Sequence, residues 1–222
     1  MTRSIGPIAL ALLLTTRLAF AHGDAVPQAV DTAGLPDLPE EMATENPWRN
    51  AQGDLMFDAV EVGAKGFNSN CARCHGLEAV SGGLAPDLRY LEASDYGDEW
   101  YLTRIQNGYE QNGAVKMPPF KDILSQEAIW AIRTYIETRP DADELAAHAD
   151  ELAALRDKVS AVDGPEEAAQ VADELDAAGG QFEALSGAPA SVTVLHQAAH
   201  VLRTRPTHTA AAAEMISGVL RN

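Results

Sequence analysis

The sequence predicts an all-α protein with two helical parts, on three observations. Apolar residues recur at helical spacing from Leu55 to Phe67, and again after Ser125. A third helical pattern, rich in alanine and free of Cys and Trp, begins after Pro140. We therefore expect a small helical domain over residues 54–139 and an Ala-rich helical bundle as a C-terminal extension over residues 140–222.

The first 21 residues read as an export signal. Arg3 precedes a short apolar run from Ile5 to Leu14, and Ala19-Phe20-Ala21 has the A-x-A pattern of a cleavage site. The run is too short to span a bilayer as a stable helix, and no later segment is long or apolar enough to do so. We expect a signal peptide over residues 1–21 that is removed after Ala21, without membrane insertion. An uncleaved anchor is the alternative.

Residues 22–53 are expected to form an extended acidic arm. Proline recurs there without apolar periodicity, at Pro27, Pro36, Pro39 and Pro47. Such a composition predicts turns and extended chain. We expect the arm to wrap the surface of the domain that follows.

Both cysteines of the chain lie in Cys71-Ala72-Arg73-Cys74-His75, directly after the first helical pattern. The spacing C-x-x-C-H is the attachment motif of a c-type haem. Cys71 and Cys74 would add to the two porphyrin vinyl groups, and His75 would be the proximal ligand of the iron. A redox dithiol, a structural zinc site and a plain disulfide are the alternatives. The first lacks a βαβ context, the second lacks further cysteines, and the third gives no reason for the histidine.

Met117 is the expected second axial ligand. It follows a Gly- and Asn-containing loop, Asn107 to Lys116, that we expect to be irregular, and Pro118-Pro119 comes next. Met56 lies too close to Cys71 to reach across a haem, while Met42 and Met215 belong to other parts of the chain. A core methionine is the alternative for Met117, since methionine commonly fills gaps in apolar cores.

The last helix of the domain is expected to begin after Ser125, a good N-cap, with Glu127 in its first turn. In the extension, apolar stripes predict four helices. The first spans Leu145 to Val162 and ends at Gly164-Pro165; the later ones span about 171–185, 191–202 and 206–219. His196 and His200 lie four residues apart and could bind zinc or copper, but no matching third ligand is evident.

Residues 22–139 resemble the class I cytochromes c, and more narrowly the soluble periplasmic cytochromes c that serve PQQ-dependent alcohol (ethanol) dehydrogenases. The resemblance rests on five stretches that are specific together and weak singly: Asn70 to Gly83, Ala85-Pro-Asp-Leu-Arg, Gly97-Asp-Glu-Trp, Asn112 to Pro118 and Leu124 to Tyr135. It implies one covalent haem c with His75 and Met117 as ligands. It also implies that the Pro86 carbonyl accepts a hydrogen bond from His75, and that Gly63 and Phe67 pack on aromatic residues of the last helix.

Charge restricts the possible partners. The chain has 16 basic and 33 acidic side chains, and loss of Arg3 and Arg17 with the signal leaves a net charge of about −19. This charge excludes nucleic-acid binding through phosphates and suits association with a basic surface. We expect a periplasmic one-electron carrier and not an enzyme. Its donor would be a PQQ-dependent alcohol dehydrogenase, and its acceptor a downstream cytochrome or terminal oxidase. A peroxidase-like haem enzyme or subunit and a haem-based sensor are the alternatives.

Overall fold

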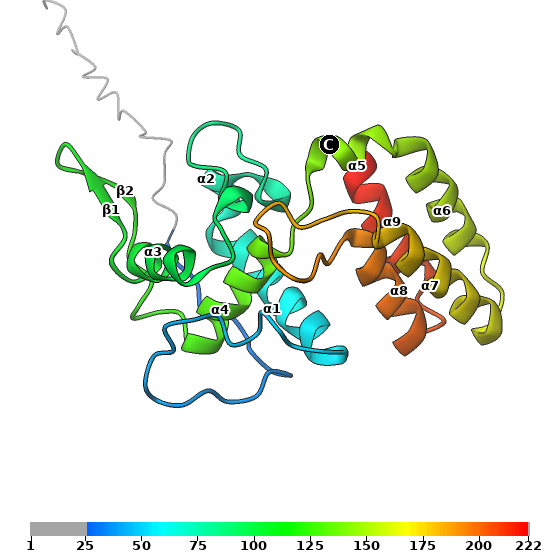
Figure 1. Ribbon diagram of the computed structural model, residues 1–222, viewed down its shortest axis with the longest axis horizontal. Helices are drawn as coiled ribbons and strands as arrows, with labels where there is room; N and C mark the ends of the chain where they lie inside the picture. The colour runs from blue at the N-terminus through cyan, green and yellow to red at the C-terminus, as the bar shows by residue number, and fades with distance from the viewer. Residues whose placement is uncertain (1–25, 222) are drawn as a thin grey trace, which may run out of the picture.

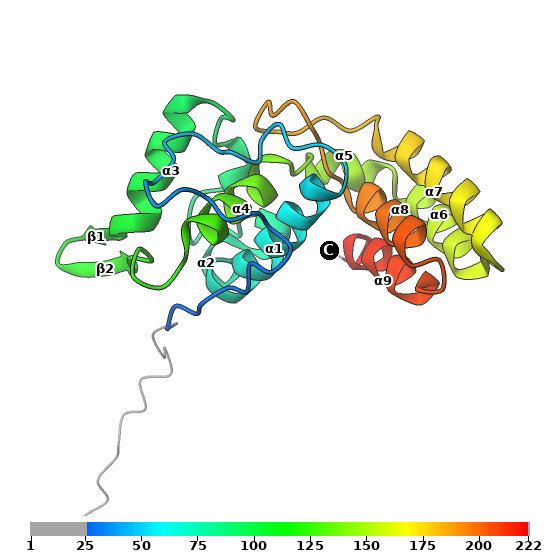
Figure 2. The ribbon, with the colours of Figure 1, turned by 90° about the horizontal axis from the view of Figure 1, so that it is seen from below.

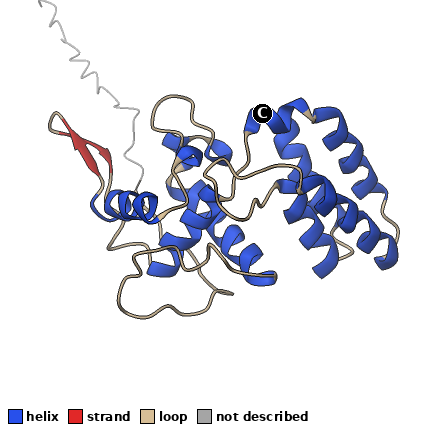
Figure 3. Cartoon of the chain, viewed as in Figure 1, coloured by secondary structure: helices blue, strands red, loops and turns tan. Residues whose placement is uncertain are grey.

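The computed structural model describes residues 26–221, which form two groups of helices side by side along the longest axis of the molecule (Figure 1). The first group contains α1 to α4, and the second contains α5 to α9. Figure 3, coloured by secondary structure, shows that both groups consist mainly of helices and loops. The expected signal peptide, residues 1–21, and the first arm residues, 22–25, lie outside the described part of the chain. Each helical group has an apolar core of its own.

The first group is organised around two long helices, α1 (Asp54–Asn70) and α4 (Gln126–Glu137). They cross so closely at Gly63 that a Cβ there would lie 2.0 Å from the Ala131 carbonyl oxygen and 2.8 Å from the Tyr135 Cβ. The ring of Phe67 packs at 5.4 Å from that of Tyr135. The expected glycine and aromatic contacts between the first and last helices are therefore present.

Four elements lie between these two helices in the chain: α2 (Ala72–His75), the 3₁₀ turns η1 (Leu77–Ala79) and η2 (Leu88–Tyr90), and α3 (Asp95–Asn107). The side chain of Ser94 caps α3, and that of Ser125 caps α4 as expected.

A β-hairpin replaces the irregular loop expected before Met117. Strands β1 (Tyr109–Gln111) and β2 (Ala114–Met117) pair antiparallel across a turn at Asn112-Gly113. Both turn residues have positive φ, 53° and 74°. Asn-Gly is a preferred sequence for two-residue hairpin turns that need positive φ twice, so the expectation of an irregular loop was wrong.

Residues 26–53 contain no helix or strand and lie across α4 (Figure 2). Gln126, in the first turn of α4, donates to the Pro39 carbonyl at 2.6 Å and accepts from the Ala43 amide at 2.5 Å. The Leu38 amide donates to Glu127 at 2.9 Å. The arm therefore supplies hydrogen-bond partners at the start of α4, as well as a buried indole at Trp48.

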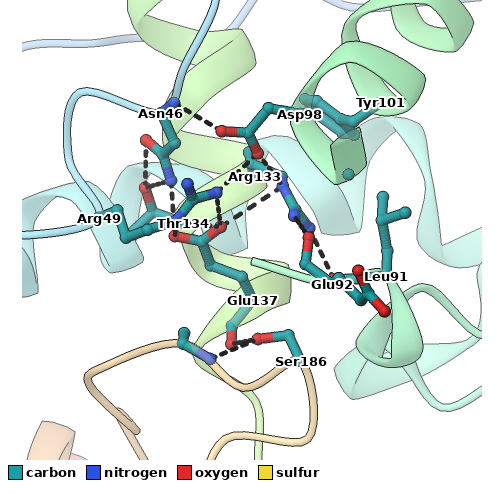
Figure 4. Close-up of polar contacts among 12 residues, drawn as sticks. Asn46, Arg49, Leu91, Glu92, Asp98, Tyr101, Arg133, Thr134, Glu137 and Ser186 are labelled. Atoms are coloured by element: carbon teal, nitrogen blue, oxygen red, sulfur yellow. Dashed lines mark hydrogen bonds and ion pairs between the residues drawn. The ribbon is translucent and has the colours of Figure 1, made fainter. Parts of the chain in front are cut away.

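A buried cluster of charges joins the arm to α3 and α4 (Figure 4). Arg49 contacts Asp98 at 2.7 Å and Glu137 at 2.8 Å, and Arg133 contacts Asp98 at 2.9 Å. Asn46 donates to Glu137 at 2.8 Å. Burial raises the pKa of Glu137, although hydrogen bonding to Arg49 and the charge of Arg133 oppose the rise. With two cations facing two anions the cluster is balanced, and removal of one member would leave a buried charge at a cost of about 3–5 kcal/mol.

The second group is a bundle formed by α5 (Ala142–Ala147), α6 (Ala149–Ala161), α7 (Pro165–Gly179), α8 (Val194–Thr204) and α9 (Thr209–Leu220). Its core is aliphatic and includes Leu152, Leu175, Leu195 and Leu202. The first helix expected in the extension is divided at His148 into α5 and α6. The ring of His148 packs edge-on against Phe182, with the ring centroids 5.2 Å apart.

Residues 180–193, which we call the strap, run from the bundle back to the first helical group (Figure 1). The Ser186 carbonyl accepts a hydrogen bond from the Ala93 amide at 3.0 Å, and the Ser186 hydroxyl donates one to the Glu137 carbonyl at 2.6 Å. The Val192 amide donates to the Thr138 carbonyl at 3.1 Å, and the Val192 side chain is buried in the core of the first group. The two groups are therefore joined by hydrogen bonds and by a shared core residue.

The crossing at Gly63 gives the first prediction. Gly63→Ala places a methyl group against the backbone of α4, and we expect the free energy of unfolding to fall by about 3 kcal/mol. Gly218→Ala is the control, because it lies in α9 with open space around its Cα and should gain about 0.5–1 kcal/mol from helix propensity. Denaturant unfolding measures both, and a Gly63→Ala variant as stable as the parent would refute the close crossing.

The contacts between the strap and the first helical group give the second prediction, which concerns a shortened chain that ends at Arg139 and lacks residues 140–222. The shortened chain retains the two crossing helices and Cys71 to His75, so we expect it to attach haem and be reducible. Loss of buried Val192, and of the Val192 carbonyl that accepts from Arg139, should lower stability by about 3 kcal/mol. Haem staining and thermal unfolding test this. Failure to accumulate haem protein would mean that the extension completes the fold of the first group.

Candidate haem-binding site

Cys71, Cys74 and His75 come together on one tight turn at the end of α1. The Cys74 and His75 amides both donate to the Cys71 carbonyl, at 3.0 and 2.9 Å, so α2 begins where α1 ends. Gly76 then turns the chain with φ 82°, and a Cβ there would lie 1.8 Å from the Val80 carbonyl oxygen. Two thiols and an imidazole are thus presented within five residues.

Burial raises the pKa of the Cys71 thiol to about 12, with a smaller contribution from neighbouring Cys74. Redox dithiols and thiolate metal sites depend instead on a lowered cysteine pKa. No group of three or more His, Cys, Asp or Glu side chains within residues 26–221 is placed to hold a metal ion. The environment of Cys71 therefore does not suit a redox or zinc-binding thiolate.

One ring nitrogen of His75 is occupied by a hydrogen bond. Nδ1 lies 2.9 Å from the Pro86 carbonyl oxygen, so Nδ1–H donates and Nε2 is left to coordinate a metal. Such a bond fixes the tautomer and orientation of a ligating histidine. The hydrogen bond expected from the resemblance is therefore present between these two residues.

The loop that carries Pro86 is held by its own side chains. Ser81 donates to the Ala85 carbonyl and accepts from the Gly83 amide. Asp87 forms an ion pair with Arg89 at 2.7 Å, and although burial acts to raise its pKa, the hydrogen bonds from Arg89 keep that pKa below its usual value. Sequence reasoning did not assign a role to Asp87 or Arg89, although both lie in the Ala-Pro-Asp-Leu-Arg stretch that carried the resemblance.

Met117 lies on a separate segment, the second strand of the hairpin. It is half-buried, and both it and Cys71 pack against the core of the first helical group. The hairpin is held to α3 by Arg104, whose guanidinium lies 4.5 Å from the ring centroid of Tyr109. A Cβ at Gly108 would lie 2.3 Å from the Met117 carbonyl oxygen, so this glycine allows the backbone of Met117 to approach α3.

Apolar side chains are exposed in the Pro86 loop and in the hairpin. Leu84, in the loop before Pro86, is 78 % exposed, and Val115, two residues before Met117, is 67 % exposed. Such exposure is typical of surfaces that contact a ligand or a partner. Exposed apolar side chains therefore occur both in the loop whose Pro86 carbonyl faces His75 and in the strand that carries Met117.

His196 and His200 do not form a second metal site. His196 belongs to the N-terminal cap of α8, where its Nδ1 accepts from the Thr193 amide at 3.2 Å. His200 stacks on Phe57 of α1 at 4.3 Å, with Asp54 at 3.7 Å from its Nδ1. The spacing of four residues instead serves a helix cap and a contact between the two helical groups.

The crossing of α1 with α4, the Cys-x-x-Cys-His turn and the His75–Pro86 hydrogen bond define a c-type haem domain. Residues 58–136 match the sequence model of a family described as cytochrome c oxidase, cbb3-type, subunit III. The chain is also 55 % identical to cytochrome c550 of Pseudomonas aeruginosa over 135 residues, which are 60 % of this chain and 91 % of that protein. The chain belongs to the cytochrome c family; it carries covalently bound haem c and is an electron-transfer protein, not an enzyme.

Other relatives resemble this chain over a smaller part of their length. Quinohemoprotein alcohol dehydrogenase ADH-IIG of Pseudomonas putida is 32 % identical over 109 residues, 49 % of this chain and 13 % of the enzyme. Quinohemoprotein alcohol dehydrogenase of Comamonas testosteroni is 28 % identical over 134 residues, 58 % of this chain and 18 % of the enzyme. No solved structure matches the chain. Between residues 26 and 221, none of the helices has the length and apolar character required to span a membrane.

The expectation that Met117 is the second axial ligand gives the third prediction. Met117→Ala should abolish the Met–iron charge-transfer band of the ferric protein, lower its reduction potential and admit external ligands, because a soft thioether favours Fe(II). Met215→Ala is the matched control, since Met215 lies partly exposed on α9. Retention of the band in Met117→Ala would identify another residue as the ligand.

Proposed function

We propose that Cys71 and Cys74 bind the haem vinyl groups as thioethers and that His75 and Met117 are the axial ligands. The observation that carries this proposal is the hydrogen bond from His75 Nδ1 to the Pro86 carbonyl, which leaves Nε2 free to bind iron. When bound, the haem supplies an iron that alternates between Fe(II) and Fe(III). The protein would hold that iron between two fixed side chains, so little rearrangement accompanies the change of charge.

We further propose that the donor is a PQQ-dependent alcohol dehydrogenase. Residues 22–139 resemble electron carriers for such enzymes. Two relatives of the chain are themselves named quinohemoprotein alcohol dehydrogenases. Such a dehydrogenase takes two electrons from its alcohol and must release them singly, which suits a one-electron acceptor. A downstream cytochrome or terminal oxidase would be the acceptor, and the periplasm would be the site of exchange.

The charge of the chain suggests how partners would meet. Residues 141–183 contain 13 acidic side chains against Arg156 and Lys158, so much of the negative charge lies on the bundle. Exposed charges steer association with a surface of opposite sign, and salt screens them over about 8 Å at physiological ionic strength. A dehydrogenase with a basic surface would therefore associate faster at low salt.

Stopped-flow mixing of a reduced quinoprotein alcohol dehydrogenase with the ferric cytochrome tests this proposal. We expect rapid haem reduction whose bimolecular rate constant falls as salt is raised, because screening weakens steering. An unrelated acidic cytochrome c of similar potential is the control. Equal rates for the two cytochromes would rule out a specific dehydrogenase partner and leave a general electron carrier.

A further inference from the structure

Two buried arginines connect the surroundings of His75 to the C-terminal extension. Arg89 lies three residues after Pro86, and Arg139 lies two residues after the last residue of α4. Their side chains are 7 % and 4 % exposed. Arg89 contacts the loop whose Pro86 carbonyl accepts the hydrogen bond from His75. Arg139 contacts Glu78, in the segment that follows His75.

Arg89 ties the Pro86 loop to the first residue of the extension. Its Nε and Nη2 donate to Asp87 at 3.0 and 2.7 Å, and its Nη1 donates to the Pro140 carbonyl at 3.4 Å. Asp87 also accepts from the Ser81 amide at 3.4 Å, so both ends of the loop meet at its carboxylate. The position of the Pro86 carbonyl therefore depends on a side chain that the extension helps to hold.

Arg139 ties the segment after His75 to the strap. Glu78 has φ 54° and Ala79 has φ 61°, a backbone region that non-glycine residues enter only when other contacts hold them there. Arg139 Nη1 lies 3.4 Å from Glu78 Oε2, to which the Tyr135 hydroxyl donates at 3.3 Å. Arg139 Nη2 donates to the Val192 carbonyl, and the Leu185 amide donates to the Arg139 carbonyl at 3.0 Å.

We call the contacts of Arg89 and Arg139 with the extension the joint. Apolar packing alone does not hold the two helical groups together in this region. A cavity of about 410 Å³ lies between the two groups and is lined by Leu77, Glu78, Arg89, Arg139 and Leu145, among others. Close packing transmits a displacement, whereas a cavity absorbs it. The two arginines therefore provide the stiff connections across this part of the interface.

We propose that the C-terminal extension acts, through Arg89 and Arg139 as positioning residues, to hold His75 against the Pro86 carbonyl and thereby sets the reduction potential of the haem. The hydrogen bond from Nδ1–H raises the basicity of a ligating imidazole, which stabilises Fe(III). If this bond lengthens, the potential rises. The extension lies beyond the family match, which ends at residue 136, so this control is an addition to the haem domain. The proposal rests on His75 as an iron ligand.

The test uses the full-length haem protein and three charge-conserving variants: Arg89→Lys, Arg139→Lys and Arg203→Lys. Lysine cannot reproduce the several directed hydrogen bonds of a guanidinium, so the first two loosen the joint without changing net charge. Arg203 contacts Asp173 at 2.7 Å and Asp176 within the bundle, so its variant makes the same change away from His75. Redox equilibration against a reference cytochrome gives the relative potentials.

We expect Arg89→Lys and Arg139→Lys each to shift this equilibrium about threefold or more toward Fe(II), and Arg203→Lys to leave it unchanged. Exchange of the His75 Nδ1 proton, followed by NMR in the Fe(II) form, should accelerate in the same two variants. Potentials and exchange rates equal to those of Arg203→Lys would overturn the proposal, as would an unprotected Nδ1 proton in the parent protein.

The Met–iron charge-transfer band separates this proposal from the ligand assignment. Its presence in the parent and in all three variants would show that iron ligation is intact, so unchanged potentials would then contradict the positioning role alone. Its absence from the parent would contradict Met117 as a ligand, while the exchange of the His75 proton would still report on the joint.

Discussion

The close crossing of α1 and α4 at Gly63 is the constraint on which the first helical group depends. Because no side chain separates the helices there, the end of α1 is fixed against α4, and Cys71 begins the turn that carries both thiols and His75. The other face of α4 holds the arm and α3 through Arg133 and Glu137. One helix therefore connects the haem motif and the arm, and Arg139, just after its end, connects it to the extension.

The prediction of the site came from local sequence signals. Cys-x-x-Cys-His identified the haem motif, Ser125 identified the start of α4, and the place of Met117 before that helix singled it out from the other methionines. The hairpin could also have been predicted, because Asn112-Gly113 is a strong turn signal. It was missed because both strands are short and largely exposed, so the alternation of polar and apolar residues that marks a strand is weak.

The buried charges could not be predicted from sequence patterns. Arg49, Asp98 and Glu137 come from three distant segments, and a charged residue in a sequence is ordinarily expected at the surface. The same holds for Arg89 and Arg139, whose contacts with the extension are made to backbone carbonyls that any residue could supply. The extension was predicted as a helical bundle from its apolar stripes, but its attachment by the strap depends on long-range contacts with no periodic signal.

The central claim is that His75 and Met117 lie on opposite faces of one haem. NMR of the reduced, diamagnetic protein tests it most directly, because a methyl group centred over a porphyrin is shifted far upfield by the ring current. We expect the methyl group of Met117, assigned by its loss in a Met117 substitution, to appear far upfield of ordinary methionine methyl signals. A Met117 methyl signal in the ordinary range would show that Met117 does not lie over the haem.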